Sequence, residues 1–231
     1  MTHRCQREGR IKTFQTCYTE IIVAAKKAFV QLAAEVELAP ARTEGGLTLE
    51  ACLRARRSCR NFKSEPLTLG DASQLLWAAQ GVTGLGGLRT APSAGATFAI
   101  RTYLVAMDVE TLSPGVYLYD PDAHALKQRK EGQLRSILRE ACCDQEEADF
   151  ASAAIVLSAS TQKLKREFGD RGIILGFIEC GHIGQNICLQ AASLGLGALT
   201  FGKTNCGGLK SAIDLPITEE PCYVILAGPK F

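Results

Sequence analysis

Residues 56–62 have the sequence Arg-Arg-Ser-Cys-Arg-Asn-Phe, and residues 92–95 have the sequence Pro-Ser-Ala-Gly. Arg56, Arg57 and Arg60 lie close together in the chain, the hydroxyl of Ser58 lies among them, and the run contains no acid. Guanidinium groups form bidentate pairs with phosphate oxygens, and a serine hydroxyl adds a neutral donor. The cluster therefore indicates a site for a phosphate-bearing ligand, although a solvated basic helix end is the alternative for such a run taken alone.

Length and charge limit the class of protein. A chain of 231 residues suits one domain, or a domain with an extension, and can bury a sizeable core. Lysine and arginine total 26 against 24 acids, and a net charge of +2 does not favour nucleic acid as a partner. The hydrophobic share of 46% is ordinary for a soluble globular protein.

The chain has ten cysteines, which raises the possibility of disulfides or a metal site. It contains no Cys-x-x-Cys pair: Cys142 and Cys143 are adjacent, and Cys180-x-His182 is a single pair without a matching one. Disulfide frameworks are typical of short secreted chains. We therefore expect reduced, mostly buried thiols, no metal site and a cytoplasmic location.

Residues of about 12–37 are predicted to form an amphipathic helix that packs on its own domain or on a partner subunit. The apolar stretch Ile21–Ala34 is interrupted by Lys26 and Lys27, so we expect neither a membrane span nor a signal peptide. Pro40, Gly45 and Gly46 mark a linker over residues 39–46. The predicted organisation is an N-terminal helix and linker over residues 1–44 and one domain over residues 45–231.

Within the domain, helices and strands are mixed without regular alternation. Thr48 and Thr68 each precede a predicted helix, and a loop is expected from Gly81 to Gly87. Further helices are predicted over residues 132–140 and 173–194, and strands over residues 102–107, 115–120, 125–128, 153–159, 198–201 and 221–227. This order favours an α+β fold with helices on a central mixed or antiparallel sheet over a doubly wound sheet.

These segments together resemble the nitroreductase-like FMN flavoproteins, most closely the branch that includes the streptolysin-associated azoline dehydrogenases. The resemblance covers about Gly45 to Phe231. It rests on residues 56–62; Gln74-Leu75-Leu76-Trp77-Ala78-Ala79-Gln80-Gly81; Arg89-Thr90-Ala91 with residues 92–95; Pro114-Gly115-Val116-Tyr117-Leu118-Tyr119; Glu179-Cys180-Gly181-His182 with Gln185-Asn186; and Leu194-Gly195-Leu196-Gly197. It implies a three-layer fold and an intertwined homodimer with FMN at the subunit interface.

The resemblance also implies roles for particular residues. Arg56 and Ser58, with Arg57 beside them, match ligands of the FMN phosphate. Arg60 matches the cation near the pyrimidine edge of the flavin, where positive charge favours the reduced form. Lys230 is the basic residue expected at the phosphate from the C-terminus.

Two loops complete the implied flavin site. Pro92, Ser93, Ala94 and Gly95 resemble the loop that reaches the flavin from the partner subunit, where small residues permit close approach of the backbone. Thr200, Phe201, Gly202 and Lys203 align with the loop whose backbone amide faces flavin N5, although the family's usual proline is Thr200 here.

Two departures from the azoline-forming branch bear on substrate. That branch has a Lys-Tyr pair before a Gly-x-Arg-Gly turn, whereas this chain has Glu167-Phe168 before Gly169-Asp170-Arg171-Gly172. A carboxylate and a phenyl ring do not replace an amine and a phenol in proton transfer, which argues against azoline oxidation. Residues 97–100 also differ from the Leu-Tyr-Pro of many relatives, a change we interpret as repacking of the core.

Several single residues have ordinary interpretations. His182 is expected in the core or at an interface. Gln185 and Asn186, at adjacent positions of one helix, are expected to form hydrogen bonds at an interface, and Trp77 is expected in the core. The implied activity is hydride transfer from NADH or NADPH through flavin N5 to a small nitro, quinone or related acceptor, with no side chain named as catalytic. The alternatives are a dehydrogenase of azoline peptides and a protein that binds FMN without turnover. No Gly-x-Gly-x-x-Gly motif indicates a separate nicotinamide site.

Overall fold

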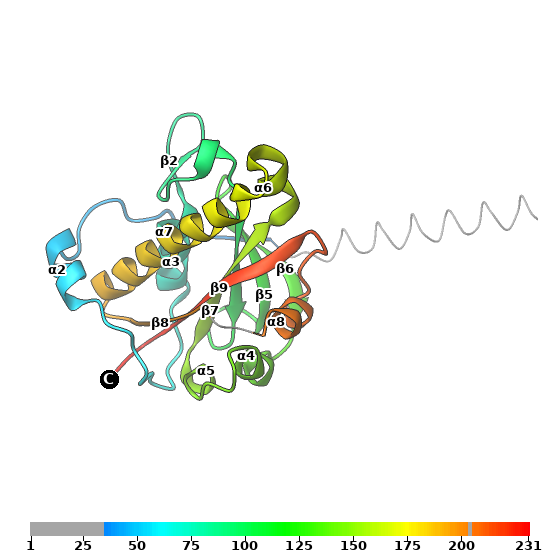
Figure 1. Cartoon of the computed structure of the whole chain (residues 1–231). Coiled ribbons are helices and arrows are strands. Elements are labelled where there is room, and N and C mark those ends of the chain that lie inside the picture. Colours follow the sequence, from blue (N-terminus) through cyan, green and yellow to red (C-terminus); the bar gives the residue numbers. More distant parts are fainter. Residues whose placement is uncertain (1–34, 203–204) are drawn as a thin grey trace, which may run out of the picture. The chain divides into compact units, whose positions relative to one another are not determined.

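The computed structural model describes residues 35–202 and 205–231. Its main sheet has the strand order β1-β6-β5-β4-β7-β9-β8, and every neighbouring pair is antiparallel (Figure 1). The strands are β1 (Glu35–Glu37), β4 (Ile100–Ala106), β5 (Gly115–Asp120), β6 (Ala125–Glu131), β7 (Ala153–Ser160), β8 (Gly197–Phe201) and β9 (Glu219–Gly228). A separate hairpin pairs β2 (Val82–Gly84) with β3 (Leu88–Arg89).

Helices cover both faces of the main sheet. They are α2 (Leu49–Ala55), α3 (Leu69–Gln80), η1 (Ala94–Ala96), α4 (Arg135–Ala141), α5 (Glu147–Phe150), α6 (Thr161–Phe168), α7 (Arg171–Ser193) and α8 (Cys206–Ala212). The core under α3 and α7 is separate from the core under α4, α5 and α8. The predicted α+β class with three layers is therefore confirmed.

Alternation along the central strands creates these two cores. In β4, Leu104 belongs to the core under α7, whereas Tyr103 and Val105 belong to the core under α4 and α8. In β7, Ile155 and Val156 divide in the same way. Both faces of these strands are apolar because each is covered by helices, and successive side chains of a strand point to opposite faces.

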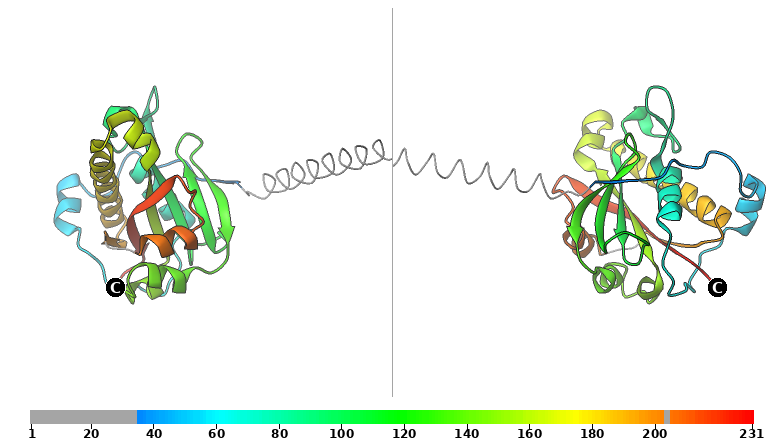
Figure 2. Two further views of the ribbon diagram at one scale, coloured as in Figure 1. Left: turned by 45° about the vertical axis from the view of Figure 1, so that its right-hand side comes forward. Right: turned by 180° about the vertical axis from the view of Figure 1, so that it is seen from behind.

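The long helix α7 lies along one face of the sheet (Figure 2). It is the segment of the described chain whose length and apolar composition would also suit a membrane span. Its buried side chains, including Ile183, Ile187 and Ala191, belong to the core shared with α3 and the sheet. We therefore interpret α7 as a core helix, and its apolar density follows from that packing.

Two predicted elements differ from the structure. The helix predicted over residues of about 12–37 was wrong at its end, because Glu35–Glu37 form β1 and pair with β6; residues 12–34 lie outside the described residues. The loop predicted at Gly81–Gly87 contains β2 and is part of a hairpin. Thr48 and Thr68 do cap α2 and α3 as expected, since each hydroxyl accepts a backbone N–H of the first turn.

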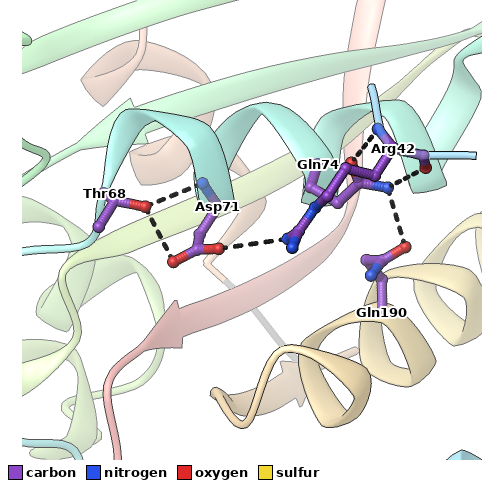
Figure 3. Close-up of polar contacts among 5 residues, drawn as sticks. All are labelled: Arg42, Thr68, Asp71, Gln74 and Gln190. Atoms are coloured by element: carbon purple, nitrogen blue, oxygen red, sulfur yellow. Dashed lines mark hydrogen bonds and ion pairs between the residues drawn. The ribbon is translucent and has the colours of Figure 1, made fainter. Parts of the chain in front are cut away.

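Gln74 holds the predicted linker against the domain (Figure 3). Its side-chain oxygen accepts the N–H of Arg42 at 2.8 Å, and its amide nitrogen donates to the Arg42 carbonyl at 3.0 Å and to Gln190 Oε1 at 3.2 Å. Asp71 pairs with the Arg42 guanidinium and accepts from the Thr68 hydroxyl. The Arg42 N–H and C=O thus both form hydrogen bonds with a side chain of α3, as they would with the backbone of a neighbouring strand.

Replacing Gln74 with alanine is expected to lower the free energy of unfolding by about 1–3 kcal/mol, because it leaves polar groups of Arg42 and Gln190 without their partner. Gln162→Ala on α6 is the matched control, since Gln162 is an exposed helical glutamine. Urea unfolding measures both variants. Equal stability of the two would contradict the role assigned to Gln74.

Candidate functional site

The arginine cluster follows α2 and lies against the edge strand β8. Ser58 forms a parallel bridge with Ala198, and the N–H of Cys59 donates to the Ala198 carbonyl at 2.9 Å. Gly197 makes this approach possible, because a Cβ there would lie 2.6 Å from Cys59 Sγ and 3.0 Å from the Phe62 ring. The backbone of the cluster is therefore fixed to the sheet rather than free at a helix end.

The predicted N5 loop and the C-terminal lysine lie beside this cluster. Thr200 is two residues beyond Ala198 on β8, which corresponds to about 7 Å along a strand. Phe62 forms an antiparallel bridge with the exposed Lys230. Gly202 follows β8, and Lys203 lies outside the described residues. The structure thus brings residues 56–60, Thr200–Gly202 and Lys230 to one edge of the sheet.

The three arginines Arg56, Arg57 and Arg60 differ in whether they form an ion pair with an acid of the chain. Arg60 forms an ion pair with Glu147 of α5 at 3.7 Å. Arg57 donates to the Arg56 carbonyl at 2.7 Å, and within residues 35–202 and 205–231 neither Arg56 nor Arg57 forms an ion pair with a carboxylate. Two guanidinium groups are therefore available to an anionic ligand, and Arg60 has an acid of its own chain nearby.

The loop Pro92–Gly95 lies elsewhere in the same chain. Ser93 Oγ accepts the N–H of Phe98 at 2.9 Å and donates to Glu179 Oε2 on α7 at 2.7 Å. Gly95 has φ of 54°, in the left-handed region that glycine adopts without a Cβ penalty. A tight 3-10 turn and a buried acid therefore set the shape of this loop.

Within one chain, α7 separates the loop from the arginine cluster. The loop is bonded to Glu179, whereas the Arg56 charge acts on the thiol of Cys188, nine residues further along the helix. Nine residues correspond to about 14 Å of helix. The two halves of the predicted flavin site thus lie at different positions along α7.

Glu179 is a candidate functional residue to which the sequence motifs assigned no role. Its side chain is 3% exposed, and burial raises its pKa, while the Ser93 hydroxyl and Arg89 act in the opposite direction. The sequence did contain a signal for this residue, because Glu179 is the one acid in the apolar stretch 173–194 and would be buried with it. A buried acid needs a partner, and that partner is the loop.

The raised pKa of Glu179 predicts a pH dependence of stability. The folded state holds this proton more tightly than the unfolded state, so the free energy of unfolding falls as pH rises from 4.5 through the folded pKa. Glu179→Gln should remove that loss, whereas Glu167→Gln at an exposed position should keep it. Chemical unfolding from pH 4 to pH 8 tests this, and parallel curves for wild type and Glu179→Gln would refute it.

Other residues near the loop also acquire definite positions. The Phe168 ring lies beside Gly95, because a Cβ on Gly95 would be 3.3 Å from it. Glu167 is exposed and paired with Arg166 at 2.9 Å. Arg89 stacks on the Phe98 ring at 4.3 Å. Glu167 and Phe168 are the pair at which this chain differs from the azoline-forming branch. Phe168 contacts the predicted flavin loop, whereas Glu167 faces solvent.

Two cavities lie at different places in the domain. One of about 370 Å³ lies between residues 42–47, α3 and α7, and is lined by no predicted site residue. The other, of about 670 Å³, is lined by Arg60, Asn61, Phe62, residues 144–147, Phe150 and Phe231. The second cavity therefore opens beside the arginine cluster. No group of three metal-ligating side chains is found in the part of the chain that the structure describes.

The three-layer antiparallel fold, with a basic cluster at its edge strand, defines a class of oxidoreductase domain. Residues 53–228 match the model of the Nitroreductase family, and this span is more than half of the chain. The chain belongs to the nitroreductase family. The family supports an oxidoreductase function.

Relatives agree with this assignment. A nitroreductase-family protein of Methanocaldococcus jannaschii is 35% identical over 184 residues, which cover 80% of this chain and 92% of that protein. A crystal structure from Ralstonia eutropha, of the same family, is 30% identical with a TM-score of 0.76, covering 85% of this chain and 90% of the other. The Escherichia coli microcin synthetase complex McbBCD, with truncated pro-MccB17 bound, contains a chain that is 21% identical with a TM-score of 0.68, covering 84% of this chain and 78% of that one. The last is a likeness of fold alone.

Proposed function

We propose that the chain is an FMN-dependent oxidoreductase that passes hydride from NADH or NADPH to a small nitro, quinone or related acceptor. One observation carries the proposal: residues 56–60, Thr200–Gly202 and Lys230, far apart in sequence, converge at one edge of the sheet. These are the segments that the family resemblance assigns to the phosphate and to the reactive ring of FMN. Their convergence in a nitroreductase-family fold supports that assignment.

The residues at this edge fit the anionic end of FMN. Arg56 and Arg57 have no carboxylate partner among the described residues, and Ser58 is exposed, so all three can donate to phosphate oxygens. Lys230 is exposed and bridged to Phe62, which places a fourth cationic residue next to the cluster. An anion bound here would be neutralised by groups already fixed to the sheet.

The segment at the end of β8 would hold the ring of FMN. Bound FMN would supply the redox chemistry. The chain's own contribution would be a backbone amide of Thr200–Gly202 and the guanidinium of Arg60, whose positive charge would oppose negative charge on the reduced ring. Glu147, paired with Arg60, moderates this positive charge.

A second copy of the chain is part of the proposal, because α7 has an apolar stripe exposed to solvent. Ile174, Phe177 and Ile178 are 57%, 57% and 50% exposed, at spacings of three and four residues. Gly181 continues the stripe, and a Cβ there would have no neighbour within 4 Å. Leu49 and Leu53 on α2 add exposed apolar surface. Such a continuous stripe is typical of a face that another helix covers.

Symmetry would then join the two halves of the site. A twofold axis that crosses α7 between Glu179 and Cys188 reverses the helix direction, so the partner's copy of the Pro92–Gly95 loop approaches this chain's arginine cluster. The exposed residues near that midpoint are Gly181, His182 and Gln185. They therefore belong to the proposed interface.

The activity on azoline peptides is less favoured. Phe168 provides a phenyl ring beside Gly95 where the azoline-forming branch has a phenol, and Glu167 pairs with Arg166. Neither side chain supplies the proton-transfer groups of that branch. We therefore propose a small molecule as the acceptor. The location proposed for the enzyme is the cytoplasm.

The test is the visible spectrum of purified protein, followed by anaerobic titration with NADH and with NADPH. The proposal predicts flavin absorbance, bleaching by at least one nicotinamide, and reoxidation by a nitroaromatic or a quinone. Flavin that neither nicotinamide bleaches would indicate a carrier without turnover. Colourless monomer that binds no added FMN would reject the proposal altogether.

A further inference from the structure

A pair of thiols lies between α7 and β9, and neither the family resemblance nor the proposed activity uses it. Cys180 projects from α7 into the core and is 2% exposed, whereas Cys222 on β9 is half-buried. Both pack in the same core cluster. They are free thiols in the structure.

A β-bulge directs Cys222 toward the helix. Tyr223 pairs with Leu157 and Pro221 pairs with Ser158, so Cys222 is an extra residue on β9 without a partner on β7. In a regular strand Cys222 and Tyr223 would point to opposite faces. Both instead pack against the core under α7. The bulge therefore turns Cys222 toward the layer that contains Cys180.

A glycine brings the helix close to this strand. A Cβ on Gly184 would lie 2.6 Å from the Tyr223 ring, so α7 crosses β9 at a distance that a larger residue would prevent. Cys180 lies one turn before Gly184 and so on the same helix face. Cys222 directly precedes Tyr223. The closest part of the crossing is therefore where the two cysteines meet.

The two thiols are in direct contact and have unequal acidity. A hydrogen bond from Cys180 is the main cause that lowers the pKa of Cys222; a backbone hydrogen bond from Ala159 acts in the same direction, whereas burial and Glu220 oppose it. The same contact, together with burial, raises the pKa of Cys180. The Cys222 thiol also donates to the Glu220 carbonyl at 3.3 Å. Cys222 is the more exposed of the two thiols, so a peroxide reaches it first, and the buried Cys180 lies in the same core cluster to react next.

We propose that Cys180 and Cys222 are a site of reversible oxidation that forms an intrachain disulfide in the presence of a peroxide. The Cys222 thiolate attacks one peroxide oxygen, which breaks the O–O bond, forms a sulfenic acid and releases hydroxide. The Cys180 sulfur then attacks the sulfenic sulfur, and the Cys180 proton leaves with the sulfenic oxygen as water. The proton that Cys222 lost on ionising converts the hydroxide to a second water, so that two thiols are oxidised and one hydrogen peroxide is reduced to two waters. A dithiol reductant reverses the bond by exchange. The inference does not depend on the proposed flavin chemistry.

The disulfide would join α7 to β9 next to the predicted N5 loop. The Tyr223 ring, one residue from Cys222, lies 4.0 Å from the position of a Cβ on Gly202. A covalent bond at Cys222 therefore fixes the segment against which that loop packs.

The test is mass spectrometry of the full-length protein after treatment with hydrogen peroxide, alkylation and trypsin digestion without reduction. The expected product joins residues 172–203, which contain Cys180 and Cys188, to residues 211–230, which contain Cys222 alone among cysteines. The joined mass is lower by about 2 Da than the sum of the two peptides, because two hydrogens are lost. Dithiothreitol should separate them.

Substitution of single cysteines shows which two cysteines form the disulfide. Cys188→Ser, at another buried cysteine of α7, should leave the joined peptide in place, whereas Cys222→Ser, at a half-buried position, should abolish it. Cys180→Ala should leave Cys222 as a sulfenic acid that dimedone traps. Peroxide that modifies Cys222 in the wild type without joining the peptides, or that oxidises the exposed Cys143 and Cys206 while leaving Cys222 reduced, would overturn the proposal.

Discussion

Replacing Arg56 with glutamine will weaken FMN binding roughly 10- to 100-fold, because one charge-assisted contact to a phosphate contributes about 1.5–3 kcal/mol. Arg56 is the C-cap residue directly after α2 and is half-buried. It has no carboxylate partner in the part of the chain that is described, so its guanidinium is available to a ligand. Equilibrium dialysis or quenching of flavin fluorescence measures the dissociation constant of the reconstituted protein.

Arg54→Gln is the matched control for this experiment. Arg54 lies in the last turn of the same helix, two residues earlier, and is exposed. It should retain the affinity of the wild type, which separates a local contact from a general change in charge. Riboflavin, which lacks the phosphate, should bind both variants equally weakly. A similar loss of FMN in both variants would show that the phosphate does not lie at Arg56.

Phe177→Asp is expected to convert the protein to a monomer. Phe177 is 57% exposed at the centre of the apolar stripe of α7, and a buried unpaired carboxylate at a helix pair costs several kcal/mol. The dissociation constant of the dimer should rise roughly 100- to 1,000-fold, which corresponds to about 3–4 kcal/mol. Analytical ultracentrifugation over a range of protein concentrations gives this constant.

Phe177→Asp should also weaken FMN binding, although Phe177 lies on α7 and the arginine cluster follows α2. In the proposed dimer the Pro92–Gly95 loop comes from the partner, so a monomer retains only half of the site. Excess FMN should restore part of the dimer, because a ligand bound at the interface favours the associated form. Ile217→Asp, at a position 89% exposed on the segment between α8 and β9, is the control and should remain dimeric. A Phe177→Asp monomer with full FMN affinity would contradict the interface location of the site.

Local sequence signals located most of the elements, because each depends on residues close in the chain. Thr48 and Thr68 cap their helices, and the strand predicted at Gly115–Asp120 has those bounds in the structure. Glu35–Glu37 were mistaken for helix, since their conformation depends on pairing with Leu126 and its neighbours on β6 rather than on local propensity. The hairpin at β2 and β3 was missed for a related reason, as its glycines resemble an open loop.

Contacts between side chains that are far apart in the sequence could not be predicted from local sequence patterns. The bond from Ser93 to Glu179 joins residues 86 positions apart, and the ion pair of Arg60 with Glu147 joins two separate segments. No spacing rule links such positions, because their distance is set by how α5 and α7 pack on the sheet. The contact of Cys180 with Cys222 likewise depends on a bulge that no local pattern marks.

The sequence by itself determined the chemical content of this protein: a cluster of guanidinium groups without acids, a small-residue loop at residues 92–95 and the α+β class, all written in neighbouring residues. Only the tertiary structure decided how that content is distributed in space. It joined the arginine cluster to β8 and Lys230, and it placed the loop at another position along α7. The physical reason is that pairing at a sheet edge and burial of Glu179 are long-range interactions, whose energies depend on the packed fold and not on adjacent residues.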